Sequence, residues 1–355
     1  MGIYLGILVS SFVFNKIRKQ IPTHEFIEFY EDACTEYGFT PCFFRINDIV
    51  VKQENMKALV RVNESEYRVK VISRPKVIHN RGLGFQKNEQ KKIEALKNEG
   101  VMIFNECTRY EKLEIHKLLM NNNEIKPHLP VTLSANINNF YQMLLKHKEI
   151  LIKPSNGTFG KDIIKITQKN NDIWLYKNLE TEQLFSINKT LPSHIENIVK
   201  DSKYIIQQRI QLATYQGCPF DIRVSVQKNH SGIWQISGIV AKVAKKGMYV
   251  TNVASGGKCY PLEIIVKNKS RVDINHLKRN IEKFALLVCE HLEKHLRHFA
   301  DVGLDIGLTN DGFPMFIECN CRDLRYSFKE AGLIDEWKST FYTPVGYANY
   351  LLKNK

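Results

Sequence analysis

The chain has 355 residues, 43% of them hydrophobic, and its 51 basic and 37 acidic residues give a formal charge of +14 at neutral pH. A chain of this length buries a large core and is expected to fold as two or three domains. The charge is spread out, without an RRM-like aromatic motif, a zinc-finger spacing or an arginine-rich tail, so we expect no nucleic-acid partner; anionic small molecules suit it at least as well.

The first 15 residues form an apolar run with the composition of a signal peptide. No basic residue precedes this run, and Lys16, Arg18 and Lys19 follow it, so we predict a buried strand and then a helix near Ile21–Glu36. No uncharged span of 18 residues occurs elsewhere, which predicts a soluble protein without a membrane span. The eight cysteines include no Cys-x-x-Cys pair and indicate reduced thiols, so the expected compartment is the cytoplasm.

The order of apolar and polar segments predicts an α/β (α+β) protein with three domains, at residues 1–115, 116–205 and 206–355. The first is predicted to be a small α/β domain in which short strands alternate with helices. The pattern predicts strands at Val50–Arg61 and Tyr67–Ser73, helices at Asn88–Asn98, Tyr110–Leu119 and Asn275–Phe299, and a mobile polar stretch at residues 179–188.

A small glycine-bearing loop, Ser155–Gly160, lies between two apolar runs that read as strands. Lys153 ends the first strand, and glycines in the loop let backbone N–H groups approach an anion closely. The spacing is neither a Walker A loop nor a dinucleotide-binding fingerprint, because a strand rather than a helix follows. We predict a flexible hairpin that covers phosphates; an ordinary Asn-Gly turn between two strands is the alternative.

Further polar groups follow on later strands. Residues 204–210 form a short apolar strand that ends in polar residues, as a hinge beside a planar base would. Strand alternation places Asp221 and Arg223 on one face, where Arg223 is able to meet a phosphate or a developing oxyanion. Lys242 precedes a basic turn at residues 245–247. A structural Asp–Arg pair and a solvated lysine turn are the alternatives.

The most informative stretch is residues 302–320, in which two apolar runs flank Asp311-Gly312, a strong signal for a hairpin. A two-residue turn makes Asn310 face Phe313 and puts Asp305 opposite Glu318, with Asn320 on the same face. Two carboxylates and an amide oxygen suit Mg²⁺. A solvated edge hairpin, or a three-residue loop that moves the two acids to opposite faces, is the alternative.

These motifs, in this order along the chain, resemble the ATP-grasp superfamily and in particular its YheC/YheD endospore coat-associated branch. The match runs through Lys-Pro and Asn-Gly-x-x-Gly, Gln-Gln-x-Ile, Pro-Phe-Asp-Ile-Arg-Val, Lys-Val-Ala, Thr-Asn-Val-x-x-Gly-Gly, Gly-Leu-Asp-Ile-Gly and Ile-Glu-Cys-Asn. Residues 74–81 and 343–351 also look like that branch. The resemblance implies an ATP-grasp fold: a pre-ATP-grasp domain at 1–115, a central subdomain with the glycine flap at 116–205, and a subdomain with the metal hairpin at 206–355.

The resemblance also implies roles for individual residues. Lys153 would bind the ATP phosphates under the glycine flap, and Arg223 would contact a phosphate or acyl phosphate. Gln208 stands where related ligases usually carry Glu, and Lys242 stands where some relatives carry Arg. The full implied set comprises Lys153, Asn156, Gly157, Gly160, Gln207, Gln208, Arg209, Ile210, Asp221, Lys242 and Asn252 for ATP, Lys153 and Arg223 for catalysis, and Asp305, Glu318 and Asn320 for one or two Mg²⁺ ions.

The implied reaction is ATP-dependent joining of a carboxylate to an amine through an acyl phosphate, which needs no protein nucleophile. The substrates expected are an unidentified acid and amine, such as an amino acid or an acidic peptide. Two other classes stay open at this stage. One is a nucleotide-binding protein of the endospore coat that has little or no turnover, and the other is a nucleic-acid binder supported only by charge.

Overall fold

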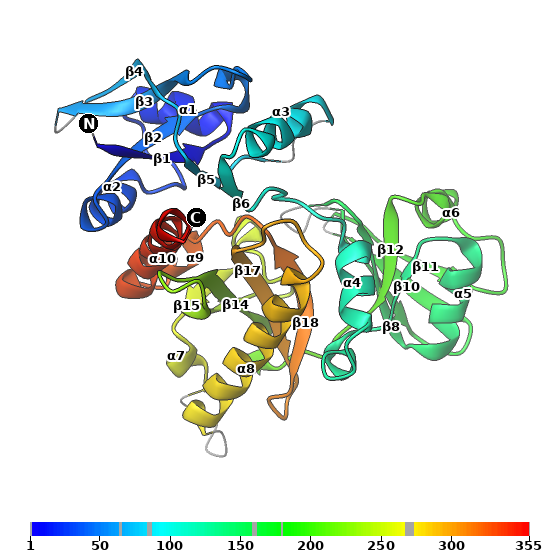
Figure 1. The fold of residues 1–355 in the computed structure, drawn as a ribbon. Helices are drawn as coiled ribbons and strands as arrows, with labels where there is room; N and C mark the ends of the chain where they lie inside the picture. The colour runs from blue at the N-terminus through cyan, green and yellow to red at the C-terminus, as the bar shows by residue number, and fades with distance from the viewer. Residues whose placement is uncertain are drawn as a thin grey trace.

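The computed structural model describes residues 2–63, 66–83, 87–157, 162–178, 180–266 and 273–354. Within these ranges the strands form three mixed or antiparallel sheets, which appear in Figure 1 as three lobes. The domain boundaries at residues 115 and 205 stay predictions. None of the helices in the described ranges is both long and apolar enough to cross a bilayer.

The N-terminal sheet has the strand order β4-β3-β2-β1-β5-β6, and β1, β2, β5 and β6 run parallel. The predicted helix at 21–36 begins only at Ile27, and the structure has an extra helix before it. Ser10 caps this extra helix, and Ile21 precedes Pro22, which disfavours helical backbone at that position. The elements are β1 Ile3–Leu8, α1 Ser11–Arg18, α2 Ile27–Glu36, β2 Phe39–Phe44, η1 Ile46–Asp48, β3 Asn55–Asn63, β4 Glu66–Ser73, β5 Val77–Asn80, α3 Lys87–Asn98 and β6 Met102–Phe104.

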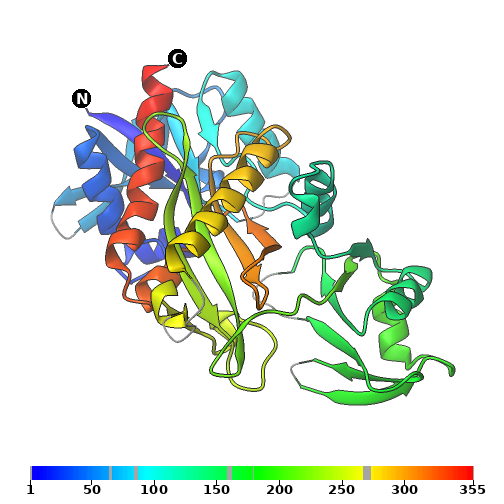
Figure 2. The ribbon, with the colours of Figure 1, turned by 90° about the horizontal axis from the view of Figure 1, so that it is seen from below.

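The second sheet is antiparallel throughout, in the order β11-β10-β9-β8-β12-β7. Figure 2 shows it standing beside the C-terminal sheet. The stretch expected to be mobile, residues 179–188, contains its edge strand β11. The elements are α4 Lys112–Met120, η2 Lys126–His128, β7 Thr132–Ser134, α5 Ile137–Lys146, β8 Glu149–Pro154, β9 Ile164–Gln168, β10 Ile173–Lys177, β11 Glu182–Ser186, α6 Ser193–Lys200 and β12 Tyr204–Gln208.

The C-terminal sheet has the order β16-β15-β14-β17-β18, with β13 paired to β14. The long helix predicted at 275–299 ends at Glu293. The elements are β13 Thr214–Tyr215, β14 Cys218–Lys228, β15 Trp234–Val243, η3 Val253–Ser255, β16 Lys258–Tyr260, α7 Leu262–Val266, α8 Ile274–Glu293, β17 Asp301–Leu308, β18 Pro314–Asn320, α9 Tyr326–Glu330 and α10 Ile334–Lys353.

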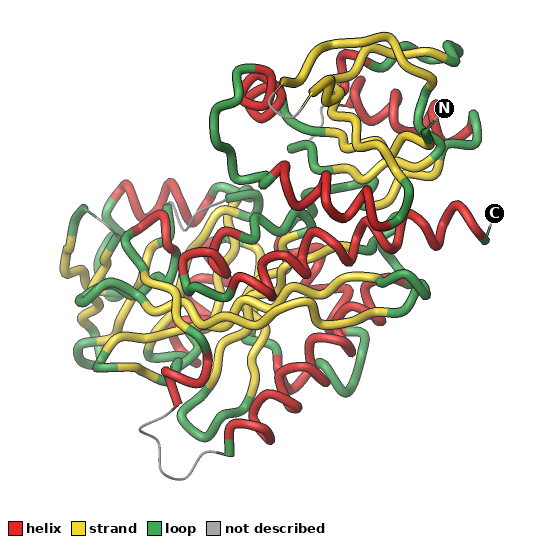
Figure 3. The backbone as a smooth tube through the Cα atoms, turned by 90° about the vertical axis from the view of Figure 1, so that its left-hand side faces the viewer, coloured by secondary structure: helices red, strands yellow, loops and turns green. Residues whose placement is uncertain are grey.

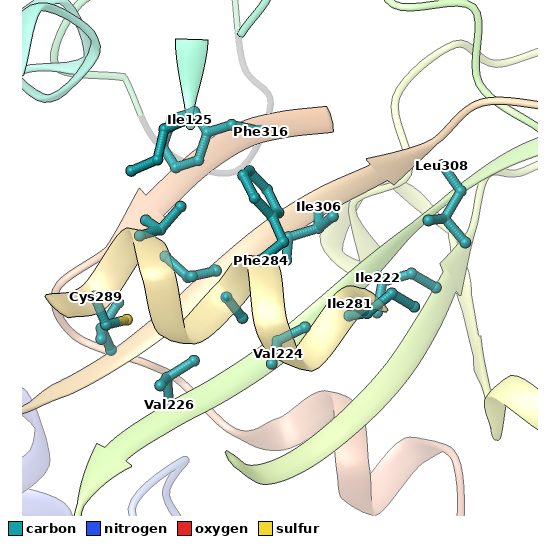
Figure 4. Close-up of a cluster of buried hydrophobic side chains, with 14 of the residues drawn as sticks. Ile125, Ile222, Val224, Val226, Ile281, Phe284, Cys289, Ile306, Leu308 and Phe316 are labelled. Atoms are coloured by element: carbon teal, nitrogen blue, oxygen red, sulfur yellow. The ribbon is translucent and has the colours of Figure 1, made fainter. Parts of the chain in front are cut away.

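The two faces of this sheet differ in chemistry. On one face, apolar residues of β14 and β17 such as Val224 and Ile306 pack against Ile281 and Phe284 of α8 (Figure 4). The alternate residues of β14, which include Asp221 and Arg223, point to the other face. Helix α10 lies against that other face and against α2 of the N-terminal lobe (Figure 3). The face that carries Asp221 and Arg223 is therefore the one on which α10 packs.

The β17–β18 hairpin pairs Asp305 with Glu318 as predicted, but its turn differs from the predicted one. Asp305 does pair with Glu318, but the two-residue turn is wrong: a five-residue loop, Thr309–Phe313, joins the strands, and Asn310 does not face Phe313. Thr309 Oγ1 accepts a 3.0 Å hydrogen bond from the Phe313 N–H, which stabilises this wider loop. A bulge beside Asp305 adds one residue on β18 and restores the expected pairing.

A buried charge network joins the N-terminal lobe to the C-terminal sheet. Asp301 accepts hydrogen bonds from Arg81 Nη1 at 3.3 Å, from the Arg325 guanidinium and from Gln227, and lies 2.9 Å from His79 Nε2. Arg81 also donates to Glu25 Oε1 through Nε at 3.0 Å and Nη2 at 2.9 Å. The two arginines balance the two carboxylates, so the interface is held by compensated charge.

Candidate active site

Two adjoining cavities collect the predicted site residues. The first is lined by residues of β8 and β12 from the second sheet and of β14, β15, β17 and β18 from the C-terminal sheet. The second shares Lys242, Asp305 and Glu318 with the first and reaches toward the N-terminal lobe. The first is lined by Lys153, Gly157, Gln207, Gln208, Arg209, Ile210, Asp221, Lys242, Asn252, Asp305 and Glu318, and the second adds Asn156, Arg223 and Asn320.

Asp305 is the centre of the charged part of the site. Arg223 forms a bidentate pair with its carboxylate, donating from Nε to Oδ1 at 2.8 Å and from Nη2 to Oδ2 at 3.1 Å. Lys242 Nζ donates to Oδ1 at 2.7 Å, and Asn320 Nδ2 donates to Oδ2 at 3.2 Å. Burial opposes the charged form, yet Arg223 and Lys242 hold the pKa of Asp305 well below its usual range. Asp305 is therefore an ionised carboxylate at neutral pH.

Lys242 bridges two acidic side chains. Its Nζ lies 3.1 Å from Asp221 Oδ1 as well as 2.7 Å from Asp305, and the Thr251 hydroxyl donates to Asp221 Oδ2. Burial raises the pKa of Asp221, with Asp305 adding to the rise and Lys242 opposing it. The pKa of Lys242 is raised because its two acidic neighbours outweigh its burial. Lys242 is therefore a cation at neutral pH beside the first cavity.

Glu318 and Asn320 supply the other predicted metal ligands. Glu318 keeps 30% of its side chain exposed, and its Oε1 lies 3.2 Å from Lys112 Nζ. Asn320 uses Nδ2 for Asp305, so its Oδ1, the atom a cation would use, has no hydrogen bond to the described residues. The described residues contain no cluster of three or more His, Cys, Asp or Glu side chains suited to a metal ion. A cation site here therefore rests on two carboxylates and one amide.

Lys153 lies at the end of β8 with only 5% of its surface exposed. Its ammonium group makes no hydrogen bond to the described residues, and burial lowers its pKa to about 8. Lys112 is nearby and donates through Nζ to the Gly157 carbonyl at 2.6 Å. Lys112 thus connects the glycine loop to Glu318. An ammonium group buried without a partner is expected to meet an anionic ligand.

The residues predicted as a hinge line the first cavity, but their side chains bond within the protein. Gln207 Nε2 donates to Thr132 Oγ1 at 2.8 Å, and Gln208 Oε1 accepts from the Val131 N–H at 3.2 Å. Arg209 donates to the acidic residue that begins β8. Each of the two amides therefore uses one of its polar atoms within the protein, and residues 207–210 all line the cavity wall.

Three predicted nucleotide contacts have other surroundings. Asn156 donates through Nδ2 to Glu111 Oε1 at 3.1 Å and lines the second cavity instead of the first. Asn252 lines both cavities, yet its Oδ1 accepts from the Ala254 N–H at 2.8 Å as the cap of η3. Gly160 lies outside the described residues.

The structure adds residues that the sequence analysis missed. Lys112 begins α4, far along the chain from both groups it contacts, so no local signal marks it. Asp323 Oδ1 accepts a 2.8 Å hydrogen bond from Arg223 Nη1. The Tyr249 hydroxyl donates a 2.8 Å hydrogen bond to the carbonyl of Ile163, just before β9. Thr251 adjoins Asn252 in a motif already noted, so that motif offered a signal. Asp323 thus fixes Arg223, and Tyr249 attaches the loop after β15 to the second sheet.

Gly303 makes room for the Arg223–Asp323 pair. A Cβ at this position would lie 2.7 Å from Asp323 Oδ1 and 2.9 Å from Arg223 Nη1, which is too close for both atoms to stay. We expect Gly303→Ala to displace Arg223 and to cost about 1–3 kcal/mol of stability. Because a shift of about 1 Å can lower a rate by roughly 100-fold, we expect a much larger loss in ATP turnover than in nucleotide affinity.

Steady-state kinetics of Gly303→Ala and calorimetric titration with an ATP analogue would measure the two effects separately. Unchanged turnover in a variant of normal thermal stability would contradict the role given to this contact.

The fold of the chain is similar to those of solved ligase and synthetase structures. The ATP-grasp ligase PsnB complexed with its minimal precursor has a TM-score of 0.53 at 13% identity, and the match covers 94% of this chain and 95% of that one. VanG D-Ala:D-Ser ligase from Enterococcus faecalis has a TM-score of 0.53 at 11% identity, covering 98% and 100%. D-cycloserine synthetase DcsG has 0.54 at 12%, covering 95% and 98%. The chain therefore has the ATP-grasp fold.

Within that class, the chain belongs to the YheC/D-like ATP-grasp family, whose model matches residues 100–351. The endospore coat-associated protein YheD of Bacillus subtilis (strain 168) is 25% identical over 303 residues, which is 81% of this chain. The endospore coat-associated protein YheC of the same organism is 22% identical over 241 residues, or 67% of this chain. The matches span 65% and 66% of the length of these two relatives.

Proposed function

We propose that this protein binds Mg-ATP and joins a carboxylate to an amine through an acyl phosphate, with release of ADP and phosphate. The observation that carries the proposal is a pair of cavities that share Lys242, Asp305 and Glu318, with Lys153 in the wall of the first cavity and Arg223 and Asn320 in the wall of the second. A PsnB ligase structure with Mg and ADP, at a TM-score of 0.52 and 12% identity, shares the fold and supports the same choice of ligands.

The oxygen donors suit Mg²⁺ in their chemistry. Asp305 and Glu318 are opposed on neighbouring strands, and the amide oxygen of Asn320 has no hydrogen bond to the described residues. Arg223 and Lys242 balance the charge of Asp305, and Lys242 would turn to phosphate oxygens when nucleotide arrives. These three residues would hold the cation, and a bound Mg²⁺ would neutralise charge on the β and γ phosphates.

The protein's own groups account for the rest of the proposed chemistry. Lys153, a buried cation without an ion pair to the described residues, would bind the nucleotide phosphates beneath the glycine loop. Arg223 has a rigid fork fixed by Asp305 and Asp323, so it is placed to stabilise charge on the transferred phosphoryl group and on the acyl phosphate. The amine then displaces phosphate without a protein nucleophile. Catalysis would rest on positioning and electrostatics.

A phosphate-release assay tests the proposal. Protein, Mg-ATP and pooled amino acids and acidic peptides are mixed, and phosphate is measured with the carboxylate pool, the amine pool, or both present. Release that requires both pools supports the ligase. Absence of release with every pool, together with ordinary Mg-ATP binding, would overturn the ligase and leave nucleotide binding.

The second candidate is a nucleotide-binding protein of the endospore coat with little turnover. The two relatives are named as endospore coat-associated proteins. The engagement of the Gln207 and Gln208 amides inside the protein is also consistent with a weakened base contact. Calorimetry that finds Mg-dependent nucleotide binding without turnover, combined with recovery of the protein in purified spore coats, would favour this candidate. The proposed compartment is the cytoplasm, with coat association tested by the same fractionation.

Lys153 predicts a pH dependence of nucleotide binding. Its pKa of about 8 means that the ammonium group is charged at pH 7 and loses its proton as the pH rises through 8. The protonated form binds phosphate, so we expect affinity for a non-hydrolysable Mg-ATP analogue to fall above pH 8, by at most about tenfold per pH unit.

Calorimetry between pH 6.5 and 9.5 would measure this decline. The Lys153→Arg variant serves as control, because arginine stays charged over that range and should flatten the profile. Identical pH profiles for the two proteins would contradict the assignment of Lys153 to the phosphates.

A further inference from the structure

Arg322, just beyond β18, is a buried cation whose bonding is incomplete. It is 8% exposed and lines the second cavity. Its Nη2 contacts His24 Nε2, and its Nε makes no hydrogen bond to any of the described residues. Burial lowers the pKa of His24 to about 4, so at neutral pH this histidine is an uncharged acceptor. Among the described residues, Arg322 thus has a neutral hydrogen-bond partner in His24 and forms no ion pair.

The other buried arginines of the described chain each contact a carboxylate. Arg81 donates to Glu25 and Asp301, Arg223 donates to Asp305 and Asp323, and Arg325 donates to Asp301. No carboxylate in the described ranges lies within ion-pair distance of Arg322. Glu25 is a neighbour of His24 in sequence, but Arg81 already holds it with two hydrogen bonds. Burying an unpaired guanidinium is costly unless a ligand completes it.

The cavity around Arg322 places that ligand beside the reaction centre. Its volume is about 690 Å³, and its wall includes Asp305, Glu318 and Asn320 together with Arg322 and His24. His24 comes from the loop between α1 and α2, so the Arg322 end of the cavity is on the side of the N-terminal lobe. The cavity therefore has a reacting end at the metal hairpin and a recognition end at Arg322.

We propose that Arg322, supported by His24, binds a carboxylate of the acceptor substrate that does not react, which makes that substrate an amino acid or a peptide with a free carboxylate. The proposal rests on the ligase function proposed above and specifies one of its substrates. A single guanidinium beside a neutral imidazole balances one negative charge, which suits a carboxylate better than a phosphate monoester with nearly two. The bound carboxylate remains unchanged in the reaction.

Paired ligand pools test this assignment without requiring turnover. One pool contains L- and D-amino acids and tripeptides with free carboxylates, and the other contains the same compounds as C-terminal amides. Ligand-observed NMR measures their binding to the full chain, with and without Mg²⁺ and a non-hydrolysable ATP analogue. We expect at least one free carboxylate to bind about tenfold or more tightly than its amide, because a charged partner left without its counterpart loses that much.

Variants of two arginines separate recognition from general charge. In Arg322→Gln we expect the preference for the free carboxylate over the amide to disappear. The control Arg279→Gln removes the same charge from an exposed position on α8 and should keep the preference. Thermal melts of both variants and titration with the Mg-ATP analogue establish that the fold and the nucleotide site persist.

Several outcomes would overturn the inference: equal binding of carboxylates and amides to the wild-type protein, no binding from either pool, or a preference that survives in Arg322→Gln. Tighter binding of phosphorylated compounds than of carboxylates would also overturn it. Failure of the ligase proposal is distinguishable, since it would appear as absence of nucleotide binding or turnover while the carboxylate preference remains.

Discussion

Glu318→Gln is expected to abolish Mg-dependent ATP turnover, by roughly 10³-fold or more, while the protein stays folded. The substitution keeps the size of the side chain and removes the charge that a divalent cation would use. Glu318 is partly exposed and forms an ion pair with Lys112, which keeps its hydrogen bond to the Gly157 carbonyl. The expected cost in stability is therefore small, about 0–1 kcal/mol.

Turnover and thermal stability are measured side by side for this variant over a range of Mg²⁺ concentrations. Glu196→Gln is the matched control, because it neutralises a carboxylate that pairs with Lys200 on the exposed surface of α6. Normal turnover in Glu318→Gln would refute the metal assignment, and an unfolded variant would show that Glu318 is structural.

Arg81→Met is expected to destabilise the protein by about 3–5 kcal/mol, because it leaves Glu25 and Asp301 buried with one fewer cation. Its effect extends to the site, since Arg81 also donates to the carbonyl of Asp323, whose carboxylate fixes Arg223. Adding Glu25→Gln removes one of the orphaned charges and should recover part of the loss. Chemical denaturation gives the free energies of unfolding.

The matched control is Arg68→Met, which breaks an exposed ion pair with Glu66 and should lower the free energy of unfolding far less than Arg81→Met does. A loss in Arg81→Met no larger than in this control would contradict the role of the network.

The same network predicts how stability depends on acid. Burial alone would raise the pKa of Glu25, but Arg81 and its other neighbours lower it to about 2. A carboxyl with a lowered pKa in the folded state stabilises that state above its ordinary pKa, and the contribution is lost as the pH falls toward 2. In Arg81→Met the pKa of Glu25 should rise toward its ordinary value, so this loss of stability between about pH 4.5 and pH 2 should become smaller than in the wild-type protein, which chemical denaturation at a series of pH values would detect.

Local patterns were sufficient for much of the site. The alternation in β14 put Asp221 and Arg223 on one face, and the hairpin signal brought Asp305 opposite Glu318. The turn was nevertheless wrong, because Thr309 stabilises a wider loop and a bulge restores the register. A bulge depends on how the strand fits its neighbours in the sheet, so the sequence of the hairpin alone does not reveal it.

Contacts between distant segments were beyond the reach of sequence patterns. Lys112 meets the glycine loop and Glu318 only because α4 packs beside β18. The sequence suggested that the Gln207 and Gln208 amides are available to a ligand. In the structure, each amide forms a hydrogen bond within the protein, Gln207 with Thr132 of β7 and Gln208 with Val131. Whether a polar side chain faces a ligand or the protein depends on which segment the fold places opposite.

The sequence by itself determined the fold class, the order of the motifs and the chemistry of the oxygen donors and lysines, since these follow from local periodicity and residue type. Only the tertiary structure decided which charges are compensated. Arg81, Arg223, Arg322 and Arg325 are alike as residues, but three meet buried carboxylates, whereas Arg322 meets none in the part of the chain that the structure describes. That difference arises because electrostatic pairing depends on distance across the fold, which position in the chain does not specify.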